Sequence, residues 1–164
     1  MKYNGALWDG FTIRHGFIND IAANRDGGAG VRLFQGASIK NCIIYKNYNA
    51  AYRARGGGLY TDGDGTVENC FIYDNVVEQK VSNNKDVFGG GLYMLQGIGY
   101  NLLVSRNYCE GKGGGIFIEN ATFYNNTVAY NGSSNETGGI HHYVDSLNDY
   151  NPGAILNVFN TLVY

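Results

Sequence analysis

Two acidic side chains, Asp62 and Glu119, occupy the same position in two copies of a repeated segment, with one copy between them. If the copies stack as neighbouring coils, their backbones at this position lie about 9.6 Å apart. Inverting glycoside hydrolases hold two carboxyl groups about 6.5–9.5 Å apart to admit a water molecule, so this is a candidate catalytic pair. Leu95 lies between them and no further acidic residues surround them, which favours chance placement on a solvated face.

The second candidate is a ligand-binding column of side chains, most of which carry rings. It takes the outward position of the strand after each glycine cluster and consists of Arg32, Tyr60, Tyr93, Phe117 and His141. At a spacing of about 4.8 Å these side chains form a ribbon along which a polysaccharide could lie. The alternative is that the stacked rings only stabilise the sheet through contacts between neighbouring strands.

The sequence predicts no metal centre and no cofactor. The segment TDGDG (residues 61–65) has two carboxylates but lacks the remaining ligands of a calcium loop, so calcium is without support. His141 and His142 are adjacent on a predicted strand, so their rings point to opposite faces and cannot share a metal ion.

These candidates depend on a repeat that organises the whole chain. Its clearest copy is GGGLYTDGDGTVENCFIYDN (residues 56–75), and related copies fill residues 27–47, 89–107 and 113–131. A further copy begins at Gly138 and is interrupted by residues 144–153. Tandem repetition indicates a solenoid, in which each coil buries its apolar face by stacking. We predict one domain over residues 1–164, with coils near 7–27, 28–55, 56–88, 89–112, 113–137 and 138–164.

Alternating apolar and polar residues predict short strands in each coil and no long helix. The first strand begins directly after the glycines, at Val31, Leu59, Leu92, Ile116 and Ile140. The second carries the inward pairs Cys42 with Ile44, Cys70 with Ile72, and Leu102 with Val104. A weaker apolar contact just before it comes from Ile39, Val67, Phe123 and Val158. In the first coil, Trp8, Phe11 and Ile13 align with Ile39, Cys42 and Ile44.

Asparagine recurs at two positions of the repeat. One column contains Asn41, Asn69, Asn101, Asn125 and Asn160, and the other contains Asn47, Asn75, Asn107 and Asn131. Asparagine tolerates left-handed backbone, and its amide can bond the identical residue one coil away. We therefore predict two asparagine ladders, and we expect replacement of Asn101 to leave amide groups unpaired at a cost of about 1–3 kcal/mol.

Composition excludes several classes of protein. The net charge of −2 gives no electrostatic support to nucleic-acid binding. No apolar run has the roughly 18 residues of a membrane helix, and the first residues lack the apolar stretch of a signal peptide. Three cysteines do not form a disulfide framework. We expect Cys42 and Cys70 to stack in the core and Cys109 to be a free thiol in a loop.

The motifs that open and close each copy are specific enough to suggest a family. GGGL at Gly56 and Gly89 and GGGI at Gly113 open copies, and IYKN, IYDN, VSRN and VAYN (residues 44–47, 72–75, 104–107 and 128–131) close them. They resemble the paired GGAI and FxxN motifs of polymorphic outer-membrane-type repeats, in the right-handed parallel β-helix superfamily of pectate lyases and many bacterial surface proteins. Ile or Val stands in place of the Phe. The resemblance covers residues 7–164 and implies an all-β, right-handed parallel β-helix of about five to six coils.

The resemblance implies secretion or display on a bacterial surface, but this fold hosts lyases, hydrolases, adhesins and stalks. Nothing in the chain matches the catalytic arginine motif of the lyases. We expect a non-catalytic segment that displays its variable loops, which all lie at one corner, and binds a glycan or a protein surface. The alternative is a polysaccharide lyase or an inverting glycoside hydrolase that uses the groove beside those loops.

A second surface is suited to protein contact. The outward positions of the second strand form an apolar stripe of Ile43, Phe71 and Leu103, continued by Thr127 and Leu162. We expect residues 76–88 or a partner to cover it, unless the register is shifted by one residue, which would turn the column inward. We also expect the chain to be a fragment whose open ends meet further coils or a second copy, since terminal coils expose strand edges.

Overall fold

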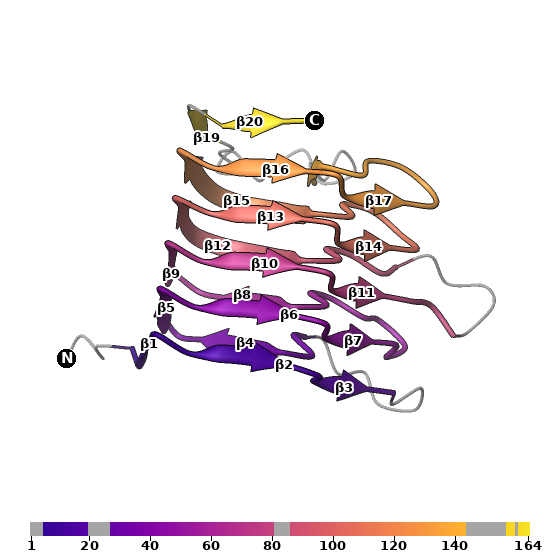
Figure 1. The fold of residues 1–164 in the computed structure, drawn as a ribbon, viewed down its shortest axis with the longest axis horizontal. Coiled ribbons are helices and arrows are strands. Elements are labelled where there is room, and N and C mark those ends of the chain that lie inside the picture. Colours follow the sequence, from indigo (N-terminus) through magenta and orange to yellow (C-terminus); the bar gives the residue numbers. More distant parts are fainter. Residues whose placement is uncertain (1–4, 20–26, 81–85, 144–156, 160) are drawn as a thin grey trace, which may run out of the picture.

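The structure is a computed structural model that describes residues 5–19, 27–80, 86–143, 157–159 and 161–164. Within these residues all regular structure is β-strand, and every strand pair is parallel. This part of the chain contains no helix, and therefore none with the length and apolarity to cross a membrane. The strands stack as successive coils of a solenoid (Figure 1), which confirms the predicted parallel β-helix fold.

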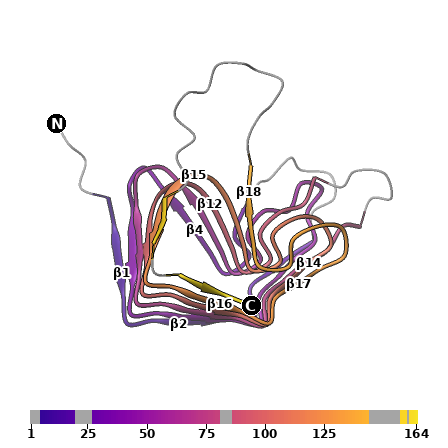
Figure 2. The same cartoon turned by 90° about the horizontal axis from the view of Figure 1, so that it is seen from above.

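The coils are built from three parallel sheets, and the first of them bends around a corner of the coil (Figure 2). The first sheet contains β1 (Leu7–Asp9), β4 (Val31–Phe34), β5 (Ser38–Lys40), β8 (Leu59–Asp62), β9 (Thr66–Glu68), β12 (Leu92–Tyr100), β15 (Ile116–Tyr124), β18 (Ile140–His142) and β19 (Asn157–Phe159). The second contains β2 (Thr12–Arg14), β6 (Ile43–Tyr45), β10 (Phe71–Tyr73), β13 (Leu103–Ser105), β16 (Thr127–Ala129) and β20 (Leu162–Val163). The third contains β3 (Phe17–Ile18), β7 (Tyr48–Asn49), β11 (Val76–Val77), β14 (Tyr108–Cys109) and β17 (Gly132–Ser133).

The predicted first strands begin at the expected residues, but the number of coils differs slightly. The solenoid has about four turns instead of five to six. The reason is that the copies at both ends are incomplete within the described residues: the first copy contributes β1 to β3, and the last contributes β18 to β20 without a strand of the third sheet. The whole insertion at residues 144–153 and Asn160 lie outside the described residues.

The sequence analysis missed the third sheet and the continuity of two strands in the first. The strands of the third sheet have only two residues each, which is too short for alternation to be recognised. In β12 and β15 the first strand and the apolar contact before the second strand merge into single nine-residue strands that bend around a corner (Figure 2).

The core lies inside the coils and follows the predicted alternation. In β4, Val31 and Leu33 are buried whereas Arg32 and Phe34 are exposed. In the second sheet, Ile44, Ile72, Val104 and Val128 pair in register and are buried. The column that contains Phe71 therefore points outward, and the alternative of a one-residue shift is excluded.

A buried asparagine ladder closes the corner between the second and third sheets. The Nδ2 of Asn47 donates to Oδ1 of Asn75 at 2.9 Å, and the same bond continues from Asn75 to Asn107 and from Asn107 to Asn131 at 3.0 Å. Each Oδ1 also accepts the backbone N–H of the preceding asparagine, and Nδ2 of Asn75 and Asn107 donates to a backbone carbonyl of the preceding coil. The ladder thus satisfies polar groups that no water reaches.

The glycine clusters fit around this ladder. Gly89, the first glycine of its cluster, has φ of +67°, which favours glycine over any residue with a side chain. A side chain on Gly91, the third glycine, would place its Cβ 2.7 Å from Nδ2 of Asn107. The glycines therefore serve the backbone turn and the space that the buried amides occupy.

The other asparagine column also stacks, but on the outside. Asn69 donates to Asn41 at 3.2 Å, and Asn101 donates to Asn69 at 3.0 Å. All three are exposed and have φ between +50° and +54°. The predicted ladder is confirmed from Asn41 to Asn101. The expected energetic cost belongs to the buried column, because solvent can replace the bonds of an exposed amide.

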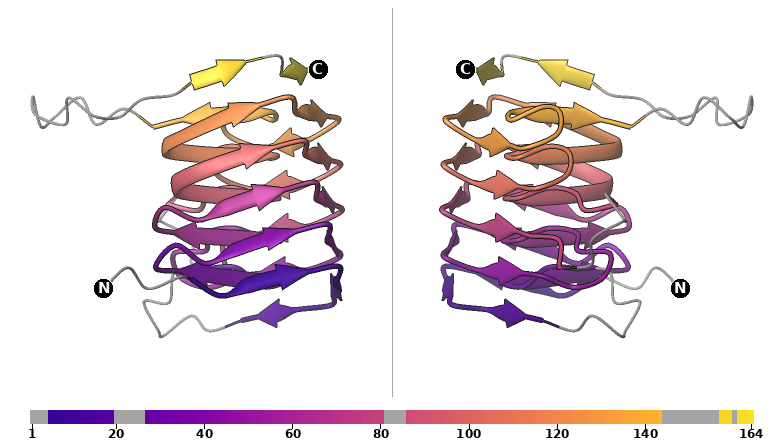
Figure 3. Two further views of the ribbon diagram at one scale, coloured as in Figure 1. Left: turned by 90° about the vertical axis from the view of Figure 1, so that its left-hand side faces the viewer. Right: turned by 90° about the vertical axis from the view of Figure 1, so that its right-hand side faces the viewer.

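The first and last described coils expose apolar side chains. Leu7, Trp8, Phe11 and Phe17 are exposed in the first coil, and Leu162, Val163 and Tyr164 are exposed at the other end. The two ends of the stack lie at opposite extremes of the solenoid (Figure 3).

The three cysteines are free and buried. Cys42 and Cys70 lie in the core, as predicted. Cys109 is not in a loop but at the end of β14, in a second apolar cluster with Ala51, Val77 and Val87, because the third sheet continues past the buried asparagine. Burial raises the pKa of the Cys70 and Cys109 thiols to about 12 each.

The two ladders can be separated by mutation. Asn107→Gly should lower the free energy of unfolding by about 1–3 kcal/mol for each buried group left unpaired. Asn101→Gly should cost much less, since glycine keeps the positive φ and only exposed hydrogen bonds are lost. Urea unfolding followed by circular dichroism measures both, and equal costs would contradict the assignment of the ladders.

Thiol labelling provides an independent test of the packing. At pH 8 the native protein should react with Ellman's reagent only slowly, because Cys70 and Cys109 stay protonated when buried and Cys42 is inaccessible. In guanidinium chloride all three thiols should react at once. Rapid labelling of one thiol in the native protein would show that its cluster is open.

Candidate functional site

The predicted ring ribbon forms on the outer face of the first sheet. Arg32, Tyr60, Tyr93, Phe117 and His141 pair in register through successive strands. From Tyr60 to His141 the centroids of successive rings are 5.2 Å apart and the planes lie within 12° of parallel. The Arg32 guanidinium lies 5.1 Å from the Tyr60 ring centroid. The column is therefore a continuous stack.

The stack is covered, which corrects the expectation of an open ribbon. Tyr60, Tyr93 and Phe117 are only 3%, 0% and 1% exposed. Phe88 packs over the column with its centroid 4.5 Å from that of Phe117, and the Arg55 guanidinium lies 5.1 Å from the Tyr93 ring. Each ring also covers its neighbour, so sugar rings cannot stack on their faces. The packing supports the alternative, in which the rings stabilise the solenoid.

A pocket of about 350 Å³ lies beside this covered stack. Its lining residues come from the loop corner and from the first sheet, and they are Arg53, Arg55, Asp86, Phe88, Lys112, Phe117, Glu119 and Tyr143. Figure 2 shows that the described parts of the loops leaving the third sheet project at this corner. The pocket is therefore a groove between the variable loops and the first sheet, where the sequence analysis expected a ligand.

The loop side of the pocket is as regular as the sheets. Arg55 pairs with Phe88 in a parallel bridge, and Phe88 pairs with Lys112 in another. The three residues directly precede the glycine clusters at Gly56, Gly89 and Gly113. The constant distance from the glycines places two cations and a ring in one column, facing the outward side chains of the first sheet.

The pocket contains charges of both signs, and one of its cations is free of described ion pairs. Three cations and two carboxylates line it, and Lys112 is further bonded to Glu136 at 3.0 Å. Arg53 is exposed, and no ion pair joins it to another described residue. A guanidinium in this position can bind a carboxylate or a phosphate through two parallel hydrogen bonds.

The structure brings Glu119 to the pocket but not Asp62. The two residues lie in the same outward column, but Asp62 does not line the pocket. Glu119 accepts a hydrogen bond from the Tyr93 hydroxyl. Burial, followed by this bond, raises the pKa of Tyr93 well above its usual value, so the hydroxyl stays a donor. The pocket therefore contains only one of the two carboxylates proposed as a catalytic pair.

The apolar stripe lies on the outer face of the second sheet. Ile43, Phe71 and Leu103 pair in register, and Phe71 and Leu103 are 49% and 38% exposed. The expected cover, residues 76–88, does not reach the stripe within its described parts. Val77 and Val87 enter the second apolar cluster, and Phe88 covers the ring stack. The described parts of this loop therefore pack against the third and first sheets, and they do not provide the predicted cover.

Sequence reasoning missed Arg53, Arg55, Asp86, Phe88 and Lys112 as pocket residues. Arg55, Phe88 and Lys112 carried a signal in the sequence, because each directly precedes a glycine cluster. Arg53 and Asp86 also have an equivalent place, since each lies three residues before the first glycine of a cluster. Among the described residues, no group of three or more His, Cys, Asp or Glu side chains could hold a metal ion.

Protonation of His141 should make the free energy of unfolding depend on pH. Burial lowers the pKa of His141 below 6.5, although Glu136 opposes the shift. The unfolded chain therefore binds the proton more readily, and stability should fall as pH drops through 6.5 toward the lowered pKa. His141→Phe, which keeps a ring on Phe117, should reduce this loss in urea titrations at pH 7 and pH 5.5. An NMR titration midpoint for His141 above 6.5 would contradict the sign.

Comparisons with models of protein families, with curated proteins and with solved structures found no match for this chain.

Proposed function

We propose that the chain is a non-catalytic β-solenoid segment that binds an anionic carbohydrate in the pocket beside the variable loops. The observation that carries the proposal is the lining of that pocket, in which Arg53, Arg55 and Lys112 lie beside Phe88, Phe117 and Tyr143. Cations that hold a carboxylate, together with apolar side chains against which the carbon face of a sugar can pack, are what a uronic acid requires.

The accessible parts of the pocket support binding from solvent. Tyr143 is 41% exposed, and Arg53 is exposed. Phe117 and Arg55 form the floor and need not move, because the stack beneath them is closed. A rigid, preformed site loses little entropy on binding. An extracellular or cell-surface location is part of the proposal and is inferred from the resemblance of the repeats to those of bacterial surface proteins.

One observation favours the enzymatic alternative, a lyase for acidic polysaccharides. Asp86 and Glu119 line the same pocket as the three cations, so proton-accepting and carboxylate-binding groups are close together. Glu119 is engaged by Tyr93, however, and the sequence lacks a calcium site. These features favour binding without cleavage.

Affinity electrophoresis in gels that contain polygalacturonate tests the proposal. The wild-type protein should be retarded, and the retardation should decrease with added salt, since exposed charges are screened. Arg53→Ala with Lys112→Ala should abolish most of the retardation. The matched control is Arg14→Ala with Lys46→Ala, which removes two exposed cations from the side of the second sheet. Equal loss in both double variants would contradict a specific pocket.

Two further measurements separate the alternatives. An increase in ultraviolet absorbance or in reducing ends during incubation with polygalacturonate would show an enzyme and overturn the non-catalytic assignment. The stripe, which we propose as a protein contact, should act independently. Phe71→Ser with Leu103→Ser should change any self-association seen by light scattering and leave the retardation unchanged. Substituting Tyr60 or Tyr93 would test folding and not binding, because both are buried.

A further inference from the structure

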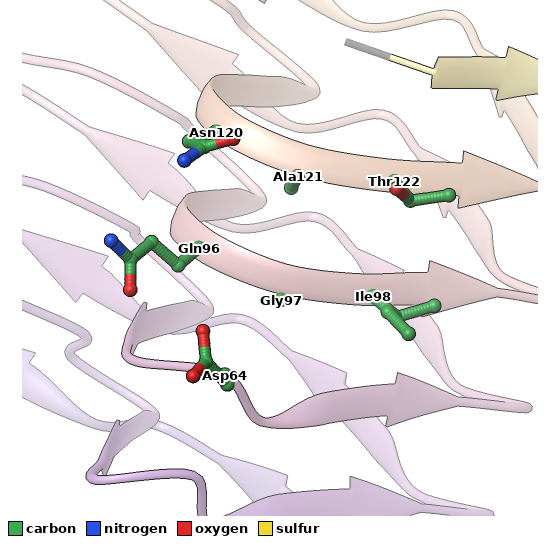
Figure 4. A pocket seen from close by; sticks show the side chains of 7 residues that line it. All are labelled: Asp64, Gln96, Gly97, Ile98, Asn120, Ala121 and Thr122. Atoms are coloured by element: carbon green, nitrogen blue, oxygen red, sulfur yellow. The ribbon is translucent and has the colours of Figure 1, made fainter. Parts of the chain in front are cut away.

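A second pocket lies on the outer surface of the first sheet, where β12 and β15 bend (Figure 4). Its volume is about 370 Å³, and its lining residues are Asp64, Gln96, Gly97, Ile98, Asn120, Ala121 and Thr122. None of them lines the pocket beside the loops. Of these residues, only Asp64 belongs to a motif weighed from the sequence, as one of the two carboxylates of TDGDG.

Two small residues pair where the strands bend, and both line the hollow. Gly97 pairs with Ala121 in neighbouring coils. Gly97 has φ of +114°, and a Cβ on it would lie 2.3 Å from the carbonyl oxygen of Gly65, so no side chain fits there. The neighbouring coils therefore pack closely at Gly97, and larger residues of the lining stand around this point.

The rim offers hydrogen-bonding groups from three successive coils. Asp64 follows β8, Gln96 lies on β12, and Asn120 pairs with Gln96 from β15, as Figure 4 shows. Within the part of the chain that the structure describes, no hydrogen bond or ion pair engages the Asp64 carboxylate or the Gln96 amide. Thr122 adds a hydroxyl on the opposite rim.

An apolar wall completes the site. Ile98 is 40% exposed and pairs with Thr122. Two residues further along the same strands, about 7 Å away on the same face, Tyr100 and Tyr124 stack with centroids 4.9 Å apart. Their edges and hydroxyls extend the surface beyond the pocket.

This pocket lacks the cations of the pocket beside the loops. Asp64 is its one ionised lining residue, and the other polar groups are neutral amides and a hydroxyl. Such a set repels anions, and a single carboxylate is too few for calcium, which takes six to eight oxygen ligands. A ligand with adjacent hydroxyl groups suits this pocket, because the carboxylate can accept two hydrogen bonds and the amides can both donate and accept them. We propose that this pocket at the bend binds an uncharged sugar residue, independently of the anionic site.

Biolayer interferometry on immobilised cellohexaose, mannohexaose, xylohexaose and maltohexaose tests the proposal. The wild-type chain should bind at least one of these neutral probes. Asp64→Ala with Gln96→Ala should weaken that binding about tenfold or more, because at least two hydrogen bonds are lost. Both residues are exposed, so the fold should be unaffected. The matched control is Asp62→Ala, which removes a carboxylate two residues away and should change the affinity less than about twofold.

Other outcomes would overturn the proposal. Binding to none of the four probes excludes the neutral-sugar site, and equal weakening by Asp62→Ala shows that the pocket is not responsible. Loss of binding after Arg53→Ala with Lys112→Ala assigns the sugar to the pocket beside the loops. Loss on adding EDTA shows that the site binds a cation. Because the probes carry no charge, this result stands whether or not polygalacturonate is bound.

Discussion

The buried asparagine ladder is the interaction on which the rest of the structure depends. Asn75 and Asn107 each satisfy the backbone N–H of the asparagine before them and a carbonyl inside the coil. An amide inside the solenoid must be fully bonded, so each coil has to stack in one register and at one distance from the next. The glycine clusters follow from this constraint, because Gly91 and its equivalents leave no room for a Cβ beside the amide.

The fixed register also explains why the variable loops produce an ordered pocket. The loops leave the coil just after the ladder and return just before the glycines, so both of their ends are held. Their last residues, Arg55, Phe88 and Lys112, therefore stack like strand residues although the loops differ in length. Phe88 and Arg55 close the ring stack, and the same column supplies two cations to the pocket. Loops of unequal length thus end in a regular column of side chains that lines the pocket.

The outer surface has regions with different physical properties. The pocket beside the loops is rich in cations and rings, the pocket at the bend has one carboxylate and neutral polar groups, and the second sheet presents apolar side chains. Outward positions are free to vary because the core and the ladder do not constrain them. A solenoid can therefore place separate binding surfaces on separate sides without altering the coil.

The sequence by itself determined the parallel solenoid, the starts of the first strands, both asparagine columns and the outward direction of Phe71 and Leu103. These features repeat, and stacking places equivalent residues of successive coils next to each other. Only the tertiary structure decided which asparagine column is buried, that Phe88 and Arg55 cover Tyr93, and that Glu119 but not Asp62 reaches the pocket. These outcomes depend on the path of a loop across neighbouring coils, and contacts between residues at unlike positions of the repeat leave no periodic signal in the chain.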